Sequence, residues 1–300
     1  MRVPETSLEQ LRTEGYAIVE GFLAKDELAD AQEGLWLEYP RPEEFFGAPE
    51  RFEHLARDMF AGVKLFPYQS WAINRLAFHP DLVDAAERFL GATALDLYKV
   101  ELWAKYSGAV NYGQPLHRDF GSHSLVVARR DGRWPQLTSF IMLSDVTEDD
   151  GPTKLVPVSH TADVPLVIGE DDPSFFLPDP GPLADAQVSA TGPAGTLLLY
   201  RNDVLHRGSQ MRGAGRSRFS LLADYKLKGT PWAGKMCWPN QGIGPAFREV
   251  MERATVRERD LFGFPPPGHE YWNEQTLTDV QARYPAMDMS EYRSAAASGA

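Results

Sequence analysis

The sequence predicts a mainly β protein with flanking helices, arranged as a sandwich or barrel. Three observations support this fold class. Short apolar or alternating runs recur between about residues 95 and 225, clusters of Gly, Pro and Asp separate these runs, and helical periodicity is confined to the two ends of the chain. The regular alternation of strands and helices that is typical of a parallel sheet is not the pattern here.

The N-terminal part, up to about residue 92, is expected to be helical. Capping residues, glycine stops and a period of 3.6 residues predict three helices there, with a short strand after the first. In chain order the expected elements are a helix that begins at the capping box Ser7–Gln10 and ends at Gly15, a strand at 16–19, a helix at about 26–38, and a helix at 80–90.

The β core is expected at about residues 93–228. Its strands are predicted where apolar residues run together or alternate with polar ones. These segments are 95–106, 124–128, 137–143, 154–157, 196–200 and 219–225. The stretch 170–192 is rich in Pro and Asp and has no clear period, so we expect either a lid or an ordered excursion there.

A helical cap is expected at about residues 229–287, on the basis of helical character around 247–257. The tail, residues 288–300, ends in a low-complexity stretch of Ser and Ala and is expected to be frayed. The sequence contains no internal repeat and no inter-domain linker. We therefore expect a single domain over residues 1–300.

Composition excludes several classes of protein. The 300 residues carry a net charge of −12, which weighs against nucleic acid or an anionic membrane as a partner. The single cysteine rules out an intrachain disulfide and a multi-cysteine zinc site. Because the sequence has neither an apolar leader nor an apolar window of membrane-spanning length, the expected location is the cytoplasm. The seven histidines remain as candidate ligands and bases.

The chain contains two His-x-Asp motifs, which offer two metal ligands from one strand because residues i and i+2 share a face. With a third ligand from another strand, such a set leaves three metal positions open, as suits a non-haem iron site. His79-Pro80-Asp81 is better explained as a helix start, since proline suits the first helical turn and disfavours a central strand. His117-Arg118-Asp119 lies in the β-rich half, where it is either a metal-binding pair or a surface pair beside a turn.

Residues far downstream can complete the second motif. His206 follows the apolar strand expected at 196–200 and is the candidate third ligand. Arg216 and Arg218 precede the strand expected at 219–225 and share its parity. An arginine there can clamp a carboxylate through two hydrogen bonds; the alternative is a solvated turn residue.

These motifs, with others between about Gly15 and Tyr225, resemble the phytanoyl-CoA dioxygenase-like (PhyH) family of Fe(II)/2-oxoglutarate-dependent oxygenases. The most telling segment runs from Asp145 to His160 and resembles the family's Pro-Gly-Ser-His segment, with Val158 in place of the glycine. The other resembling segments are 15–19, 79–91, 114–119, 206–209 and 218–220.

The resemblance implies a double-stranded β-helix, the jelly-roll core of cupin-like proteins. It also implies that His117, Asp119 and His206 ligate Fe(II). The histidine of the resembling Ser-His, His160, is not a metal ligand in the family pattern, so we do not assign it to the metal.

The resemblance further implies that an arginine near 216–218 binds the distal carboxylate of 2-oxoglutarate. Arg218 is favoured because it fits an Arg-x-Ser pattern and stands directly before the strand, although Arg216 is closer to the usual spacing from the third ligand. Thr138 is a candidate hydroxyl partner for the same carboxylate. Gln114 is either a contact of the co-substrate or substrate, or a turn residue.

The resulting hypothesis is a dioxygenase that uses Fe(II), 2-oxoglutarate and O2, hydroxylates a small molecule, and releases succinate and CO2. Desaturation, epoxidation and ring formation would look identical in sequence. Halogenation is less expected, because a halogenase of this type needs a small non-ligating residue where Asp119 stands. The alternatives from other classes are a metal-binding β-barrel that is not an oxygenase, such as a cupin-like isomerase, and a non-catalytic ligand-binding protein. The sequence indicates neither the substrate nor the oligomeric state.

Two further expectations concern residues around this site. The tryptophans, Trp103 among them, are expected to pack in the interior rather than to stack on a substrate. His123, four residues after Asp119, is either a pocket residue or a hydrogen-bonded part of the scaffold.

Overall fold

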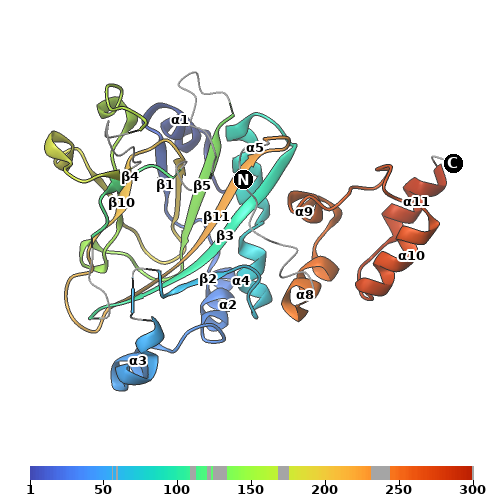
Figure 1. Ribbon diagram of the computed structural model, residues 1–300, viewed down its shortest axis with the longest axis horizontal. Helices are drawn as coiled ribbons and strands as arrows, with labels where there is room; N and C mark the ends of the chain where they lie inside the picture. Colours follow the sequence, from blue (N-terminus) through green and yellow to red (C-terminus); the bar gives the residue numbers. More distant parts are fainter. Residues whose placement is uncertain are drawn as a thin grey trace.

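A computed structural model of the chain describes residues 1–55, 57–58, 60–108, 113–119, 123, 134–167, 176–230 and 244–298. Two antiparallel β-sheets face each other, and helices cover the outer side of the larger sheet (Figure 1). This arrangement confirms the predicted mainly β fold with flanking helices, and the two facing sheets form the jelly roll that the resemblance implies.

Within the described residues, the larger sheet has six strands in the order β1, β9, β5, β11, β3, β2, and the smaller has five in the order β7, β4, β10, β6, β8. Their bounds are β1 (Tyr16–Val19), β2 (Val63–Leu65), β3 (Leu95–Tyr106), β4 (Leu116–His117), β5 (Gln136–Met142), β6 (Thr153–Leu155), β7 (Phe176–Leu177), β8 (Val188–Ala190), β9 (Leu197–Arg201), β10 (His206–Gly208) and β11 (Ser217–Leu227). Each strand expected from the sequence overlaps one of these, except the one at 124–128, which lies outside the described residues.

The described α-helices lie before β3 or after β11 in the chain. Their bounds are α1 (Glu5–Glu14), α2 (Lys25–Leu35), α3 (Pro42–Gly47), α4 (Trp71–Leu76), α5 (Pro80–Leu90), α8 (Pro245–Arg253), α9 (Val256–Leu261), α10 (Glu274–Arg283) and α11 (Ser290–Ser298). Helix α1 begins two residues before the expected capping box, because Pro4, with extended backbone, occupies the N-cap position. Gly15 ends α1 in the left-handed conformation, as predicted.

Alternation along the strands gives the larger sheet two different faces. On β11, Phe219, Leu221, Ala223 and Tyr225 belong to the main hydrophobic core. That core also contains the apolar residues of α1, α4 and α5, so it lies on the helix-covered side of the sheet. The alternate residues of β11 face the smaller sheet. The helices therefore stabilise the fold from one side and leave the space between the sheets for a site.

His79 caps α5 and does not take part in the site between the sheets. Its Nδ1 accepts a hydrogen bond from Asp81 N at 3.2 Å, and its Nε2 lies 3.1 Å from Glu27 Oε1. The ring packs edge-on against Phe22, with 5.1 Å between ring centroids. Hydrogen bonds from Arg2 above all hold the pKa of Glu27 at about 2, and His79 acts in the same direction. The predicted structural role of His79 is confirmed.

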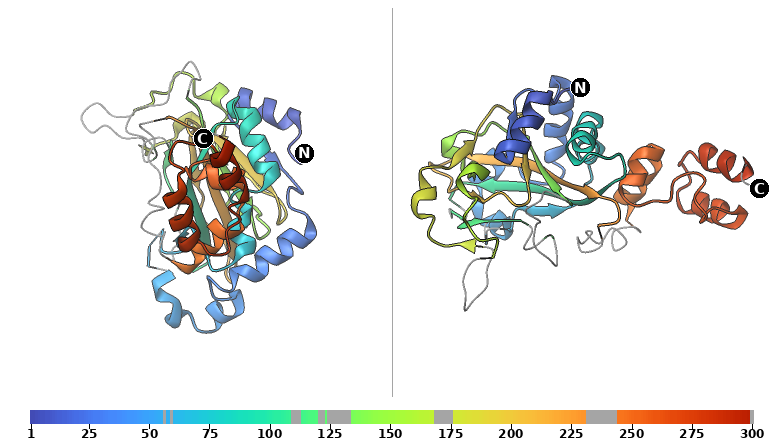
Figure 2. Two further views of the ribbon diagram at one scale, coloured as in Figure 1. Left: turned by 90° about the vertical axis from the view of Figure 1, so that its right-hand side faces the viewer. Right: turned by 90° about the horizontal axis from the view of Figure 1, so that it is seen from above.

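The C-terminal helices extend beyond the sheets (Figure 2). The helical character expected around 247–257 is divided between α8 and α9, because Thr255 starts a new helix by accepting a hydrogen bond from Glu258 N. Helix α11 occupies the segment where the sequence predicts a frayed tail at 288–300. It is ordered because Tyr292 is buried 4.8 Å from the ring of Trp272 and accepts a hydrogen bond from Arg259.

The described part of 170–192 is an ordered excursion that contains β7 and β8, the two edge strands of the smaller sheet. Among the described helices, none combines the length and the hydropathy that a bilayer-spanning helix requires.

Replacement of His79 by alanine is predicted to lower the free energy of unfolding by about 2 kcal/mol, because α5 loses its cap and Glu27 loses a partner. Chemical denaturation measures the change. His79→Asn, which retains a capping acceptor, should recover part of the loss. Metal binding should be the same in all three proteins; loss of metal binding by His79→Ala at unchanged stability would contradict the structural role.

Candidate metal centre

Three side chains of metal-ligand type meet between the two sheets. His117 ends β4 and His206 begins β10, and the antiparallel pairing of these strands places the two residues directly opposite each other. Asp119 follows two residues after His117. One ligand atom from each residue lies within 4.8 Å of the other two. The three residues predicted from the sequence therefore lie together, although Asp119 stands just beyond the short strand rather than on it.

Backbone carbonyls fix the orientation of both imidazoles. His117 Nδ1 lies 3.0 Å from Pro115 O, and His206 Nδ1 lies 3.1 Å from Val204 O. A neutral ring that donates from Nδ1 carries its lone pair on Nε2. The two Nε2 atoms lie 3.8 and 3.4 Å from Asp119 Oδ1. Two nitrogen lone pairs and a carboxylate oxygen thus point into one space, and this donor set suits a divalent transition metal.

Tyr200, a residue that the sequence did not single out, holds the carboxylate of this set. Its hydroxyl donates to Asp119 Oδ2 at 2.9 Å, which leaves Oδ1 toward the two histidines. Tyr200 is the penultimate residue of the apolar strand β9 and is almost fully buried. A buried tyrosine needs a hydrogen-bond partner, and this need was the signal available in the sequence.

The electrostatics of the three residues favour a bound cation. Burial lowers the pKa of His117 to about 4, so this ring is neutral. Burial alone would raise the pKa of Asp119, but His206 outweighs it and holds the pKa well below its ordinary value. Conversely, burial would lower the pKa of His206, and Asp119 reverses that effect. The carboxylate is ionised and buried, with its charge directed at the two rings.

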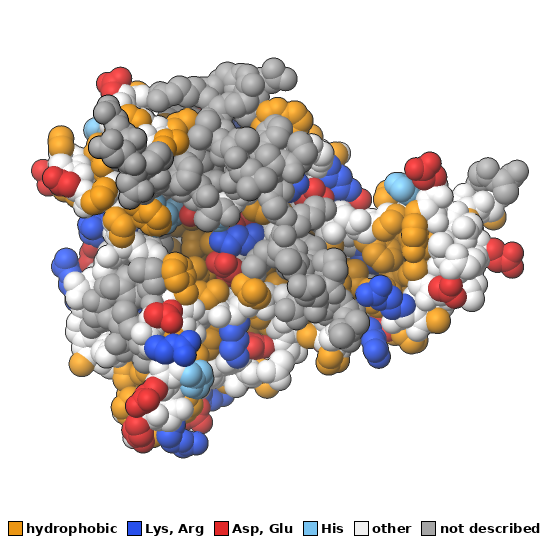
Figure 3. Space-filling view, in the orientation of Figure 1, with side chains coloured by type: hydrophobic (Ala, Val, Ile, Leu, Met, Phe, Trp, Pro, Cys, Tyr) orange, Lys and Arg blue, Asp and Glu red, His pale blue; other side chains and the backbone are white. Residues whose placement is uncertain are grey.

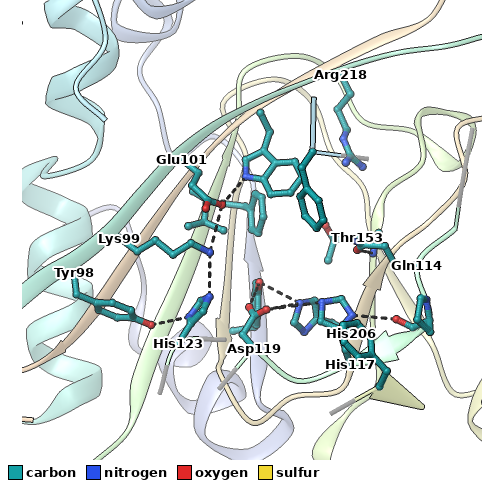
Figure 4. A pocket seen from close by; sticks show the side chains of 18 residues that line it. Tyr98, Lys99, Glu101, Gln114, His117, Asp119, His123, Thr153, His206 and Arg218 are labelled. Carbon is teal, nitrogen blue, oxygen red and sulfur yellow. Dashed lines mark hydrogen bonds and ion pairs between the residues drawn. The ribbon is translucent and has the colours of Figure 1, made fainter. Parts of the chain in front are cut away.

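These residues line a cavity of about 810 Å³ between the sheets, large enough for a small molecule. Figure 3 shows a recess in this face of the molecule, with hydrophobic side chains around acidic and basic groups. Figure 4 shows the lining side chains: the two histidines and Asp119 lie together, Arg218 lies away from them, and Tyr98, Lys99 and His123 form a separate group.

The two candidate arginines occupy different places. Arg218 lines the cavity, and its Nη1 donates to Gly151 O. Arg216 precedes β11 and instead pairs with Asp150, with Nε 2.9 Å from Oδ1. A second nitrogen of Arg216 donates to Thr147 Oγ1 at 3.1 Å. Among the two, Arg218 is therefore the one that the fold brings to the cavity.

Gln114 also lines the cavity and joins two segments of its wall. Its side-chain Oε1 accepts from Gly208 N at 2.8 Å, while its own backbone N donates to Gly208 O at 2.9 Å. Gly208 lies two residues after His206 on β10. Gln114 is thus both a cavity residue and a support for the strand that carries one ligand.

The assignment of Thr138 to the carboxylate bound by Arg218 is corrected by the structure. Thr138 lies opposite Asp224, six residues along β11 from Arg218, which is about 20 Å of strand. Its hydroxyl is fully buried, and its cross-strand neighbours are Asp224 and Tyr200 rather than Arg218. The strand register, which the sequence does not reveal, separates the two. Thr153 on β6, a residue that the sequence analysis missed, supplies a hydroxyl to the cavity lining.

A bulge in β3 brings two polar residues of this strand to the cavity wall. Lys99 pairs with Asp224 and Leu97 with Tyr225, so Tyr98 has no partner in the register, and Tyr98 and Lys99 both line the cavity. His123 Nδ1 lies 2.9 Å from the Tyr98 hydroxyl, and His123 Nε2 lies 3.0 Å from Lys99 Nζ. His123 is therefore both a cavity residue and part of a hydrogen-bonded scaffold.

Burial determines the protonation of this group. It lowers the pKa of His123 to about 4, so the ring is neutral and its Nε2 accepts from Lys99. Burial also raises the pKa of Asp224 well above its ordinary value. Downstream of the bulge, Glu101 and Trp103 continue the same face of β3 and line the cavity. The expectation that Trp103 packs in the interior is thus incomplete.

Comparison with known proteins supports the fold and the family. The family model described as phytanoyl-CoA dioxygenase (PhyH) matches residues 11–220. No curated protein sequence matches the chain.

Several solved structures share the fold at low sequence identity. EctD from S. alaskensis, with 2-oxoglutarate and 5-hydroxyectoine, is 19% identical over 75% of this chain and 77% of that chain, with a TM-score of 0.54. The epimerase SnoN, in complex with Fe3+, alpha ketoglutarate and nogalamycin RO, is 20% identical over 77% and 94% of the respective chains, with a TM-score of 0.53. HygX from Streptomyces hygroscopicus, with nickel and 2-oxoglutarate bound, is 17% identical over 76% and 88%, with a TM-score of 0.51.

Replacement of Tyr200 by phenylalanine is predicted to weaken metal binding about tenfold, because Asp119 loses the hydrogen bond that orients it. A competition titration with Fe(II) or Co(II) under anaerobic conditions measures the affinity. Tyr16→Phe is the matched control, since Tyr16 pairs with Tyr200 on the neighbouring strand. Equal affinities in the two variants would show that the Tyr200 hydroxyl does not support the metal centre.

Proposed function

Since the chain belongs to the phytanoyl-CoA dioxygenase family, we propose that it is an Fe(II)- and 2-oxoglutarate-dependent oxygenase that acts on a small molecule. The observation that carries the proposal is the convergence of His117, Asp119 and His206 in a cavity that Arg218 also lines. The proposed ligands are these three residues. The protein contributes two imidazoles, which would bind the metal in their neutral forms, and one carboxylate; this set leaves metal positions for a chelating co-substrate and O2.

Arg218 is the proposed partner of the distal carboxylate of 2-oxoglutarate. Its cross-strand neighbour on β3 is Lys105, whose Nζ donates to Ser209 O at 3.1 Å. Burial above all, with the charge of Arg218, lowers the pKa of Lys105 to about 8. A positive end of the cavity formed by an arginine suits a planar carboxylate, which it can bind through two hydrogen bonds. Gln114 and Thr153 supply further polar atoms to the lining.

The remaining walls keep the reaction away from water. Phe140, Leu222 and Trp103 line the cavity on the side of the larger sheet, and Phe176 lies beside His117 at 5.4 Å between ring centroids. When bound, Fe(II) and 2-oxoglutarate supply the oxidising chemistry, with succinate and CO2 as the co-substrate's products. The chain's own part is to hold the ligands, place the co-substrate and confine the substrate.

Hydroxylation is the proposed outcome. The fold alone does not select it, because the structures with this fold include an epimerase. The ionised carboxylate of Asp119 fills the third ligand position, which weighs against a halide at that place. We further propose that the protein acts in the cytoplasm, where a chain with a single cysteine needs no intrachain disulfide.

The metal and co-substrate hypothesis predicts a visible charge-transfer band when Fe(II) and 2-oxoglutarate are added to the protein without oxygen. Absorption spectroscopy detects it. Asp119→Ala should lose the band and should not form succinate when oxygen is admitted. Wild-type protein that binds the metal and shows no band would contradict the oxygenase proposal, and unchanged turnover by Asp119→Ala would contradict the ligand assignment.

Replacement of Arg218 by alanine is predicted to raise the 2-oxoglutarate concentration needed for half-maximal band intensity by at least about tenfold, because a charge-assisted contact is lost. Arg216→Ala is the matched control and should leave this concentration nearly unchanged, although the loss of its pairing with Asp150 lowers stability. If this concentration rises in Arg216→Ala and stays unchanged in Arg218→Ala, Arg216 is the residue that binds the co-substrate.

A further inference from the structure

The wall of the cavity formed by β3 carries an acidic group that the proposed chemistry does not use. Lys99, Glu101 and Trp103 occupy alternate positions of the strand and line the cavity together. Asp119 and Arg218 are assigned to the metal and the co-substrate. Of the charged residues described in the lining, Lys99 and Glu101 remain for the substrate.

The contacts of Glu101 leave one of its oxygens open. Trp103 Nε1 donates to Glu101 Oε2 at 3.1 Å, and Lys99 Nζ lies 3.3 Å from the same oxygen. Within the described residues, Oε1 receives no hydrogen bond. The side chain retains 12% of its exposure in a position that lines the cavity. Figure 4 shows Glu101 beside Lys99, on the side away from His123. A carboxylate oxygen only accepts hydrogen bonds, so it needs a donor from the substrate.

Lys99 is already engaged from two sides. Its ammonium contacts His123 Nε2 at 3.0 Å and Glu101 Oε2 at 3.3 Å. The charge of Lys99 is thus paired with Glu101 and one of its donors is taken by His123, whereas Glu101 keeps Oε1 as an acceptor that faces the cavity.

The aromatic residues beside Glu101 favour a cation. Trp103 and Phe60 both line the cavity, with 5.8 Å between their ring centroids and the rings edge to face. Phe60 is 54% exposed although it is aromatic, as expected for a ring at the entrance to a binding site. The faces of such rings attract ammonium groups and repel anions.

We propose that the substrate carries a protonated amino group, which Glu101 binds through its open oxygen on the part of the cavity wall that Trp103 and Phe60 also line. This inference rests on the proposed function, because it assigns the metal and 2-oxoglutarate to other parts of the cavity. Glu101 is then a residue that determines substrate selectivity, with Trp103 and Lys99 holding its carboxylate in place.

The test compares three probes of similar shape and different charge, namely phenethylamine, its N-acetyl derivative and hydrocinnamate. Each is titrated into the anaerobic complex of the protein with Fe(II) and 2-oxoglutarate, and calorimetry gives the Kd. The amine should bind at least about tenfold more tightly than the neutral amide, and the carboxylate should bind most weakly. If the wild-type protein binds amine and amide equally, or prefers the carboxylate, the proposal is overturned.

Substitution then locates the preference. Glu101→Gln keeps the shape of the side chain, removes its charge and should abolish most of the preference for the amine, whereas Glu101→Asp should retain part of it. Glu20→Gln, at an exposed position of the surface, is the matched control. An amine preference that persists in Glu101→Gln would overturn the role of Glu101. The charge-transfer band is recorded for every protein. A wild-type protein with the band and no amine preference contradicts this inference alone, while a wild-type protein that binds the metal without the band contradicts the proposed function.

Discussion

The pairing of β10 with β4 is the constraint on which the site depends. Both strands are very short, and their register places His206 opposite His117, with the two rings 4.4 Å apart. Each ring is turned by a backbone carbonyl two residues before it, so the same local geometry is used twice. Asp119 needs a support from elsewhere, and β9 of the other sheet supplies it through Tyr200. The candidate metal centre is therefore supported by residues of both sheets.

The larger sheet separates stability from chemistry. Its outer face is apolar and packs under the N-terminal helices, where His79 and its neighbours fix the start of α5. Its inner face carries polar residues that an ordinary core would exclude, among them Thr138 and Asp224, both fully buried. Polar groups in such a place have a desolvation cost, and the extensive apolar packing on the opposite face offsets it. A sheet whose outer face is well packed can therefore keep buried polar residues on its inner face.

Much of this architecture was predictable from local sequence signals. Helix α5 has a proline at its start, a glycine at its end and a clean apolar period, so its bounds were predicted correctly. The long strands β3 and β11 were recognisable because apolar and polar residues alternate along them. The three proposed metal ligands were predicted from a motif together with a family resemblance, and the fold brings them together. What the sequence did not reveal depends on register: the distance from Thr138 to Arg218, the contact of Tyr200 with Asp119, and the two-residue strand β4 arise only when strands pair. The order in α11 likewise depends on the burial of Tyr292 against distant residues.

The bulge at Tyr98 divides β3 into two halves of opposite phase. Before it, Leu95 and Leu97 belong to the main core. After it, Val100, Leu102 and Ala104 do, while the odd-numbered positions Lys99, Glu101 and Trp103 turn to the cavity. Substitutions at those odd positions can change what the cavity accepts without disturbing the core packing beneath. Natural variation along this one strand is thus a route by which descendants of the same scaffold can diverge in substrate while their iron site and core stay the same.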